Sequence, residues 1–253
     1  MSSETDARAK ASAKAACVPD GVRVYAIGDI HGRADLLEDM MRLIETNSEA
    51  AGPVSETVLV FIGDYVDRGP DSAGVIDRLL RLVRDGRYRT RLLKGNHEVM
   101  FLDFLDDPAA LLQWAVNGGA ATMESYDIDV EAMQMAPSED LRQTALAAIP
   151  ADHLKLLHNL EISVVIGDYL FVHAGVRPGI PLAAQSEHDM IWIREPFLEH
   201  EGDLGKFVIH GHTPVREPEI RANRIDIDTL AWRTGKLTAL VLEGASQRFL
   251  TTQ

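Results

Sequence analysis

The sequence predicts an α/β fold built around a parallel sheet. Short apolar runs that resemble strands each end in a glycine-flanked aspartate, asparagine or histidine, and the first three ends carry Asp29, Asp64 and Asn96. These residues are separated by 35 and 32 positions, which fits strand–helix–strand units of about 30 residues or more. Because the ends of parallel strands converge at one edge of a sheet, the first half is expected to be a βαβαβ unit with its polar residues gathered there.

The first strand is predicted at residues 22–27, which are mostly apolar. A helix is expected from about Ala34, because five apolar residues that follow recur at helical spacing and would form its buried face. They are Leu36, Leu37, Met40, Leu43 and Ile44. Gly52 and Pro53 should end this helix.

The second strand is predicted at residues 57–62, a continuous apolar run typical of a strand covered on both faces. Asp71 or Ser72 can cap the helix that comes next. The buried stripe of that helix is expected to be Val75, Ile76, Leu79 and either Leu82 or Val83. A third, short strand is predicted at residues 91–93.

Residues from Glu98 to about Ile149 are predicted to be mostly helical, with Ser138 capping a last helix that runs through Ala148. This region is part of a mostly helical insert that we predict at about residues 98–160 of the domain. It shows no ligand pattern of its own. We expect it to form a lid or wall over the site.

Strands dominate the remainder of the chain. A hairpin is predicted from residues 162–166 and 169–172, because Gly167-Asp168 between them is a strong turn signal. A further strand is expected at 207–209. A final hairpin is expected from residues 224–228 and 237–242.

The 253 residues carry a net charge of −14 and one cysteine, Cys17. This charge repels nucleic acid and anionic membrane surfaces at long range, so neither is expected as a partner. It still permits an anionic substrate, because bound cations can reverse the charge locally. A single cysteine cannot form an intrachain disulfide.

A single domain is expected at residues 21–253, preceded by a flexible leader at 1–20. The leader lacks the apolar core of a secretory signal. No apolar run is long enough for a transmembrane helix. Together these features favour a cytoplasmic location.

The first two strand ends carry residue types that bind metal ions. Asp29 and His31 are two positions apart, so both side chains can face the same way. A carboxylate with an imidazole suits Mn, Fe or Zn. Asp64 occupies the position that matches Asp29, and its two oxygens could bridge two cations. Taken alone, each segment is equally compatible with a solvated turn or a helix cap.

The third strand end places Asn96 beside His97. Asn96 offers a neutral oxygen to a metal, and its neighbour His97 is then expected to face the substrate. A paired carboxylate would fix the tautomer of that ring and favour its charged form; Asp67 is the candidate. The same two residues could also be a helix cap and a first-turn residue, and this is compatible with the functional role.

Two further histidines, His173 and His212, also follow predicted strands. A lone histidine at such a position is more often packed in the core. His210 is interpreted as a packing residue or as a support for a ligand. The five motifs together outweigh these separate alternatives, because a structural protein has no need for aspartate, asparagine or histidine beside glycine at five strand ends.

These segments resemble the calcineurin-like metallophosphoesterases, specifically the phosphoprotein phosphatase family. The family pattern GDxHG, GDxVDRG, GNHE, HAG and GHT is matched in order between Gly28 and Thr213. The stretch 191–195 is similar to the Trp-x-Arg segment of bacterial and phage phosphatases. The C-terminal Ser-Ala-Pro-Asn-Tyr motif of the eukaryotic branch is absent. An Asp-Thr-Gly turn often found in relatives appears here as Asp228-Thr229-Leu230.

The resemblance implies a four-layer α/β/β/α sandwich that holds two divalent metal ions. Manganese is the expected ion, with Fe, Zn or Co as alternatives. The first ion would be held by Asp29, His31 and the bridging Asp64. The second would be held by Asp64, Asn96, His173 and His212.

The resemblance also implies roles for residues that do not hold metal. His97, paired with Asp67, would be the general acid. Substrate phosphate would be bound by Arg68, Arg194 and Asn96. The reaction would be hydrolysis of phosphomonoesters by a hydroxide that bridges the two metals.

The leading expectation for the substrate is a protein phosphorylated on serine or threonine. A dinucleotide polyphosphate hydrolase of the diadenosine tetraphosphate type is the alternative enzyme, because such enzymes share most of this pattern. A non-catalytic binding protein with a relic site is a third interpretation. It is disfavoured because every ligand position carries a competent residue. The expected partner is therefore a phosphorylated protein or a small phosphoester.

Overall fold

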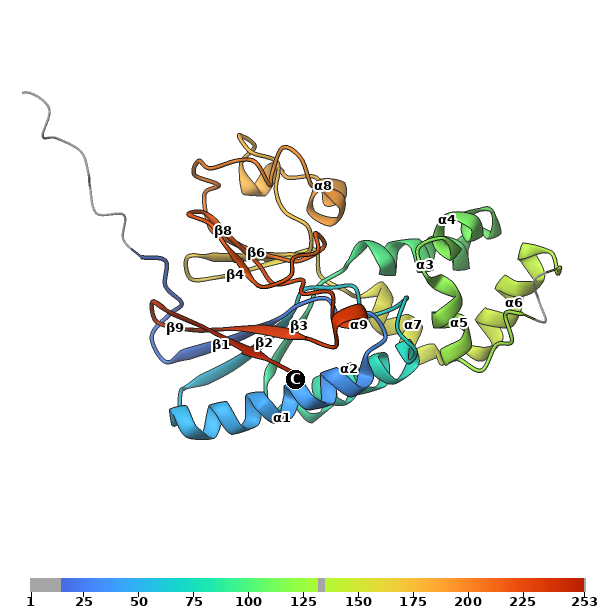
Figure 1. The fold of residues 1–253 in the computed structure, drawn as a ribbon, viewed down its shortest axis with the longest axis horizontal. Helices are drawn as coiled ribbons and strands as arrows, with labels where there is room; N and C mark the ends of the chain where they lie inside the picture. The colour runs from blue at the N-terminus through green and yellow to red at the C-terminus, as the bar shows by residue number, and fades with distance from the viewer. Residues whose placement is uncertain (1–14, 132–134, 253) are drawn as a thin grey trace, which may run out of the picture.

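A computed structural model describes residues 15–131 and 135–252 of the chain. Two five-stranded sheets lie face to face at its centre (Figure 1), in the orders β10-β9-β1-β2-β3 and β4-β5-β6-β8-β7. The first sheet consists of β1 (Val22–Ile27), β2 (Glu56–Phe61), β3 (Arg89–Leu92), β9 (Thr238–Glu243) and β10 (Ser246–Thr251). The second consists of β4 (Ser163–Ile166), β5 (Tyr169–Val172), β6 (Phe207–His210), β7 (Glu219–Ile220) and β8 (Arg224–Asp226).

Helices cover the outer face of each sheet, which confirms the expected four-layer α/β/β/α arrangement (Figure 1). The first sheet is covered by α1 (Ala34–Ala51) and α2 (Ser72–Asp85). The second is covered by α8 (Glu187–Trp192), which the short 3-10 helix η2 (Leu182–Ala184) precedes. One more short helix, α9 (Ala231–Thr234), lies between β8 and β9 in the chain.

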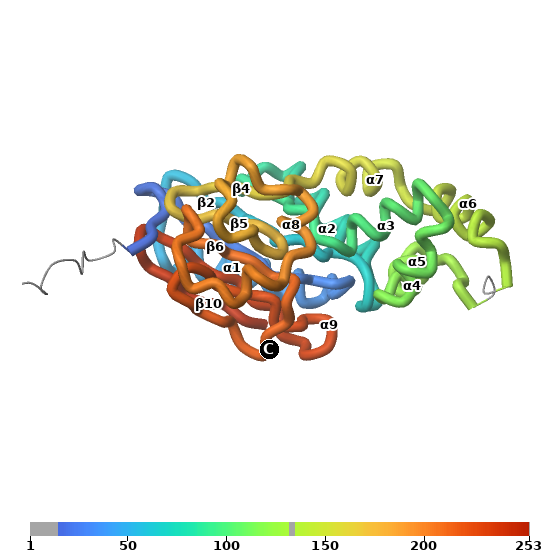
Figure 2. Tube along the Cα trace, turned by 90° about the horizontal axis from the view of Figure 1, so that it is seen from above, coloured from blue at the N-terminus to red at the C-terminus, as the bar shows by residue number. Residues whose placement is uncertain are grey.

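Residues 96–158, called the helical segment below, extend to one side of the two sheets (Figure 2). Its elements are α3 (Asn96–Asp106), the 3-10 helix η1 (Pro108–Ala110), α4 (Leu111–Ala115), α5 (Gly119–Ser125), α6 (Ser138–Ala148) and α7 (Ala151–His158). Ser138 is the first residue of α6, but its side chain does not cap the helix, and α6 is not the last helix because α7 follows. The sequence expectation was wrong on both points.

Apolar side chains fill the spaces between the layers, and β1 contributes side chains to two of these apolar clusters. Val24 and Ala26 belong to the cluster between the two sheets, whereas Tyr25 and Ile27 belong to the cluster under α1 and α2. This alternation follows from the pleat of a strand. Strands β1, β2 and β3 are parallel, as are β5 and β6. Their carboxyl ends therefore deliver the loops that carry the polar motifs to shared edges.

The expected elements of the first half are present with small differences. The buried face of α1 contains Met41 in place of Leu43, which is 37% exposed. Asp71 caps α2 by accepting a hydrogen bond from Gly74 N at 2.8 Å. In the stripe of α2, Leu82 is buried and Val83 is exposed.

The expected final hairpin between residues 224–228 and 237–242 was wrong. Strand β8 belongs to the second sheet, where it pairs with β6 in parallel and with β7. Strand β9 belongs to the first sheet, where it pairs with β1 and β10. The chain therefore crosses from one sheet to the other at α9, and β9 and β10 form the last hairpin.

Of the leader expected at residues 1–20, residues 1–14 lie outside the described part of the chain. Cys17 and Val18 pack against the body of the protein, because Cys17 N donates to Asp168 Oδ2 and Val18 N to Gly244 O, both at 3.0 Å. Among the helices of the described ranges, none has the length and hydropathy needed to cross a bilayer.

Candidate metal centre

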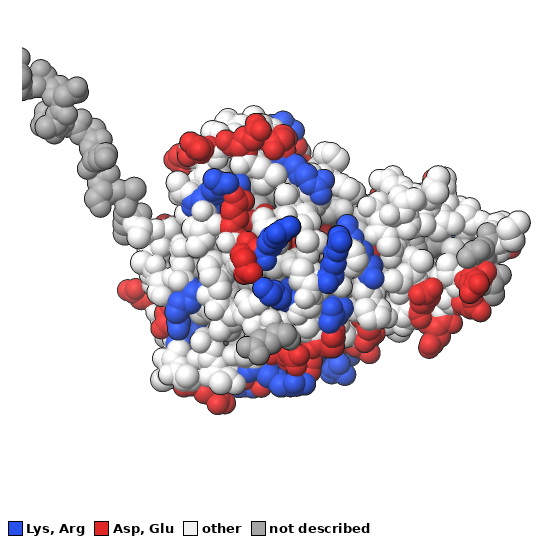
Figure 3. All heavy atoms as spheres, viewed as in Figure 1, with Lys and Arg blue, Asp and Glu red and all other residues white. Residues whose placement is uncertain are grey.

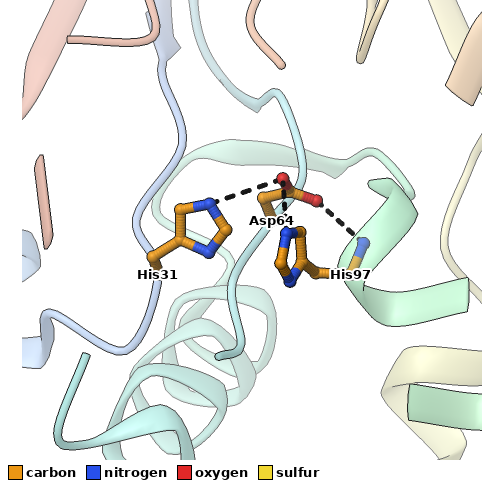
Figure 4. A group of neighbouring side chains, drawn as sticks. All are labelled: His31, Asp64 and His97. Carbon is orange, nitrogen blue, oxygen red and sulfur yellow. Dashed lines mark hydrogen bonds and ion pairs between the residues drawn. The ribbon is translucent and has the colours of Figure 1, made fainter. Parts of the chain in front are cut away.

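Asp64 lies at the centre of the site, in the loop after β2. Its Oδ2 is 3.5 Å from Nε2 of His31 and 4.0 Å from Nε2 of His97 (Figure 4). Its Oδ1 is 3.4 Å from Nε2 of His173. Within residues 15–131 and 135–252, two buried sets of side chains have ligand atoms close enough together to hold a cation, and Asp64 belongs to both. The sets are His31, Asp64 and His97, and Asp64, His173 and His212.

The loops that carry these residues are tied together by their backbones. The N–H groups of Ile30 and His31 both donate to Asp64 O, at 3.1 and 2.8 Å. Five residues of the expected site have left-handed backbone conformations with positive φ: His31, Asp64, Asp67, Arg68 and His212. Such conformations cost about 1–3 kcal/mol each in non-glycine residues and persist only where the surroundings fix them.

Two histidines are oriented by backbone carbonyls. Nδ1 of His31 lies 2.9 Å from Val66 O, and Nδ1 of His173 lies 3.0 Å from Ile62 O. Because a carbonyl only accepts, Nδ1 carries the proton in each ring. Nε2 is therefore left with a free lone pair, and it is the nitrogen that faces Asp64. Metal-binding histidines are commonly held in this way.

Asn96, the first residue of α3, lies between the histidines of the second set. Its Oδ1 is 3.0 Å from Nε2 of His173 and 2.8 Å from Nδ1 of His212. As placed, this oxygen and Nε2 of His173 are both acceptors, so their contact is unfavourable. A cation between them would remove the conflict and take both as ligands. The donor set of oxygen and imidazole nitrogen suits Mn, Fe or Zn.

Asp29 adjoins the two sets. Its Oδ2 accepts a hydrogen bond from His212 N at 3.1 Å, whereas its Oδ1 is buried without a partner among the described residues. Burial raises the pKa of Asp29 well above its usual range, and the nearby carboxylates of Asp228 and Asp64 raise it further. A cation beside Oδ1 would relieve both features, so the residues present fit the expected metal.

The glycines of the motifs allow these side chains to approach the backbone closely. A Cβ at Gly211 would lie 2.1 Å from Oδ1 of Asp29, and one at Gly95 would lie 2.1 Å from Oδ1 of Asp64. Both distances are far below a van der Waals contact. Any larger residue at either position would displace a carboxylate of the site.

His97 is held by a side chain instead of a carbonyl. Its Nδ1 lies 2.7 Å from Oδ2 of Asp67, and both residues are buried. The structure thus brings together the pair that the sequence predicted. Because Nδ1 faces Asp67, Nε2 is the ring nitrogen that faces Asp64 and the site.

The pKa values separate the histidines into two groups. Burial lowers the pKa of His31 to about 3, that of His212 to about 2, and that of His173 in the same direction. Burial also disfavours the charged form of His97, but Asp64 and Asp67 outweigh it and raise its pKa. The first group stays neutral, as a metal ligand must be, whereas His97 favours the proton that an acid needs.

Two arginines complete the site. Arg68 and Arg194 line a small pocket of about 100 Å³ together with His31, Asp64, Asn96, His97, Asn117, Trp192, His212 and Asp228. Arg68 donates to Nε2 of His31 at 3.3 Å and Arg194 to His212 O at 3.5 Å. Around the region between α8 and α9, basic side chains gather on a face that is acidic along its rim (Figure 3). An anion would therefore be attracted locally despite the net charge of −14.

Several residues of the site had no assigned role from the sequence. The buried carboxylate of Glu98 accepts hydrogen bonds from the N–H groups of Asp64, Tyr65 and Gly95 at 2.7–2.9 Å, which shapes the loop of Asp64. Its place in the Gly-Asn-His-Glu motif was the available signal. His210 contacts the ring of Phe197 and is in neither set.

Asp228 lines the pocket, and burial raises its pKa to about 6. Leu230, two residues later, has φ 57° and stands at the position where the family resemblance led us to expect glycine. The turn is therefore kept in the left-handed conformation although the glycine is missing. Trp114 and Thr122 also contact the site, through Asp67. No sequence pattern marked either residue.

Known proteins resemble this chain over most of its length. Bis(5'-nucleosyl)-tetraphosphatase PrpE of Anoxybacillus flavithermus is 26% identical over 85% of this chain and 88% of its own. Serine/threonine-protein phosphatase 1 of Salmonella typhimurium is 30% identical over 85% of this chain and 89% of its own. A solved structure of a protein provisionally assigned as a diadenosine tetraphosphatase aligns over 95% of this chain and 99% of that one, with a TM-score of 0.63 and 23% identity.

The family profile of the calcineurin-like phosphoesterases matches residues 22–233, a range that contains all five motifs and both sets of candidate ligands. The range begins at β1 and ends within α9, so it spans the edges at which the strand ends meet. The chain belongs to the calcineurin-like phosphoesterase family.

Proposed function

We propose that this protein is a metal-dependent phosphomonoesterase that removes phosphate from phosphoserine or phosphothreonine in proteins. The observation that carries the proposal is the position of Asp64, whose two oxygens face different histidines and which belongs to both sets of candidate ligands. Two arginines line the same pocket. A site of this kind suits a phosphate group held between cations and guanidinium groups.

The candidate ligands can be divided between two metal ions. Asp29, His31 and Asp64 would hold the first, and Asp64, Asn96, His173 and His212 the second, with manganese as the preferred ion. When bound, such a pair of cations stabilises developing negative charge and lowers the pKa of water, so that a nucleophile is available near neutral pH.

The remaining residues act directly on the ester. Arg68 and Arg194 present planar guanidinium groups that match phosphate oxygens. The carboxylates of Asp64 and Asp67 favour the charged form of His97, in which both ring nitrogens carry a proton: Nδ1–H donates to Asp67, and Nε2–H is free for the ester. As the bond between phosphorus and the leaving oxygen breaks, that oxygen takes the Nε2 proton. Water supplies the new oxygen on phosphorus, and its released proton restores His97. General acid catalysis of this type contributes about 10²–10⁴-fold.

Hydrolysis of a dinucleotide polyphosphate is the second candidate. It is favoured by the similarity to PrpE over 85% of the chain, since that relative is named as a bis(5'-nucleosyl)-tetraphosphatase. Trp192 lines the pocket beside the arginines. Its indole could stack on a nucleobase as well as on a peptide side chain.

A direct comparison of substrates tests the proposal. Purified protein loaded with Mn²⁺ would be given a phosphoserine peptide and diadenosine tetraphosphate at equal concentrations. We expect a higher kcat/KM for the peptide. Faster turnover of the dinucleotide would favour the second candidate, and turnover of neither with any divalent cation would leave the relic-site interpretation.

A further inference from the structure

Asp67, the partner of His97, is held by more than that histidine. Nε1 of Trp114 donates to both of its carboxylate oxygens, at 3.0 Å each. The hydroxyl of Thr122 donates to Oδ1 at 2.7 Å and accepts from the backbone N–H of Asp67 at 2.8 Å. Asp67, Trp114 and Thr122 are all buried, so water does not compete for these bonds.

Trp114 is itself fixed by the helix that begins at the site. Its ring stacks on Phe101 at 4.8 Å and on Phe104 at 5.0 Å between ring centres, with interplanar angles near 20°. Both phenylalanines belong to α3, whose second residue is His97. A closed loop of contacts therefore runs from His97 through Asp67 and Trp114 back to α3.

The local sequence leaves room for this arrangement. A Cβ on Gly119 would lie 2.4 Å from two ring carbons of Trp114, so only glycine allows the indole to lie against the start of α5. Thr122 lies one turn farther along α5. The side chains of α4 and α5 thus reach Asp67 from a part of the chain without any of the family motifs.

We infer that Trp114 and Thr122 are positioning residues that hold Asp67 in the orientation required by His97, so that the helical segment takes part in protonation of the leaving group. This inference rests on the proposed function, because it assigns a support to its general acid. It predicts that loss of the indole N–H affects esters according to how much their leaving groups need a proton.

The test compares two esters in one variant. Trp114→Phe keeps an aromatic ring between Phe101 and Phe104 but removes the donor. A phosphoserine peptide has an alkoxide leaving group that needs protonation, whereas 2,4-dinitrophenyl phosphate does not. We expect kcat for the peptide to fall by about 10- to 100-fold, the range for loss of a hydrogen bond to a charged group. The kcat for the dinitrophenyl ester should change by less than about 2-fold, and the amount of Mn²⁺ bound per chain should stay the same.

Two further variants separate positioning from packing. Tyr126→Phe removes a buried hydroxyl from the same segment, where it contacts His153 and not Asp67, and should leave the ratio of the two rates unchanged. Adding Trp114→Phe to His97→Asn should cost nothing more, because the acid is already absent. Thr122→Val provides the same test if Trp114→Phe does not fold. Equal losses for both esters, or an additive loss beyond His97→Asn, would show that Trp114 only packs.

An activity-independent measurement keeps the inference separate from the proposed function. In ¹⁵N-labelled protein, the indole N–H resonance of Trp114 should resist exchange with deuterium and should move in His97→Asn but not in Tyr126→Phe. If wild-type protein hydrolyses neither ester, the proposed function fails while this result still decides the contact. An indole resonance that does not respond to His97→Asn would overturn the inference.

Discussion

His173 contacts one oxygen of Asp64 and His97 faces the other, yet the two rings are supported by different parts of the chain. His173 is oriented by Ile62 O at the end of a strand, whereas His97 is oriented by Asp67, which Trp114 and Thr122 hold from the helical segment. Burial lowers the pKa of His173, while carboxylates raise that of His97. A backbone carbonyl at Nδ1 keeps the ring neutral and leaves the lone pair of Nε2 facing Asp64. A carboxylate at Nδ1 favours the charged ring, in which Nε2 also carries a proton. The support behind each ring thus matches the two roles proposed for them, a metal ligand for His173 and an acid for His97.

The largest effect is expected from Asp64→Asn, which removes the residue shared by both sets of ligands. Metal occupancy and activity should be lost together, with kcat/KM reduced by at least about 1,000-fold, because several kcal/mol of charge stabilisation disappear. Metal analysis and steady-state kinetics on the same sample would measure this. Asp152→Asn, at an exposed position, is the control. Near-normal turnover in Asp64→Asn would rule out its bridging role.

His97→Asn should separate the role of His97 from that of the residues proposed to bind metal. The metals should remain, because none of the residues proposed to hold them is changed, and kcat should fall by about 10²–10⁴-fold with little change in KM. His153→Asn, a buried histidine in the helical segment, is a suitable control for packing. Loss of metal would place His97 among the ligands, and a change confined to KM would contradict its role as the acid.

Arg194→Ala should weaken the binding of phosphate without affecting either the metal ligands or His97. Inhibition by free phosphate should weaken by about 10- to 100-fold, the range for a lost charged hydrogen bond. Arg177→Ala, an exposed arginine paired with Asp189, is the matched control. Unchanged inhibition in Arg194→Ala would show that it does not bind phosphate.

The smallest effect is a pH dependence of stability in protein without bound cations. The low pKa values of His31 and His212 mean that the unfolded chain binds more protons below its histidine pKa of 6.5, so the free energy of unfolding should rise with pH up to that point. Burial raises the pKa of Glu98 from 4.5 to about 8, so this term lowers stability as pH rises. Between pH 6.5 and 8 the effect of His31 and His212 has ended, and the groups with raised pKa values remain: Glu98, together with Asp29 and His97, whose raised pKa values act in the same direction.

We therefore expect the free energy of unfolding to fall by at least about 1 kcal/mol per pH unit over that upper range, the contribution of one such group. Urea denaturation at a series of pH values would measure it. Added Mn²⁺ should stabilise more at pH 8 than at pH 6.5, because binding displaces protons. A flat profile from pH 6.5 to 8 would indicate that the buried carboxylates are already ionised.

The two regions also differ in how far the sequence could predict them. The residues around Asp64 follow strands and lie beside glycines, so their convergence was predictable from the repeated strand ends, whereas their division between two ions came only from the family resemblance. Trp114 and Thr122 lie on short helices without a motif, and they reach Asp67 only because the indole stacks on α3. That contact depends on tertiary packing, which no local pattern reports.

The same limit explains the errors in the fold. Strands β8 and β9 are close in sequence and have turn residues between them, which favours a hairpin. However, β9 pairs with β1, more than 200 residues away in the chain. Next to β1 in the first sheet, the apolar residues of β9 are buried on both faces. Likewise Met41, and not Leu43, is buried in α1, because the orientation of the helix is set by the sheet beneath it.

The most direct test of the account is the metal stoichiometry of the folded protein. Equilibrium dialysis against Mn²⁺ followed by elemental analysis should give two ions per chain in the wild type and fewer than one in Asp64→Asn. A crystal structure of the loaded protein should place Asp64 between the two ions. Folded wild-type protein that binds no stoichiometric metal, or that binds two ions without contact to Asp64, would contradict the account.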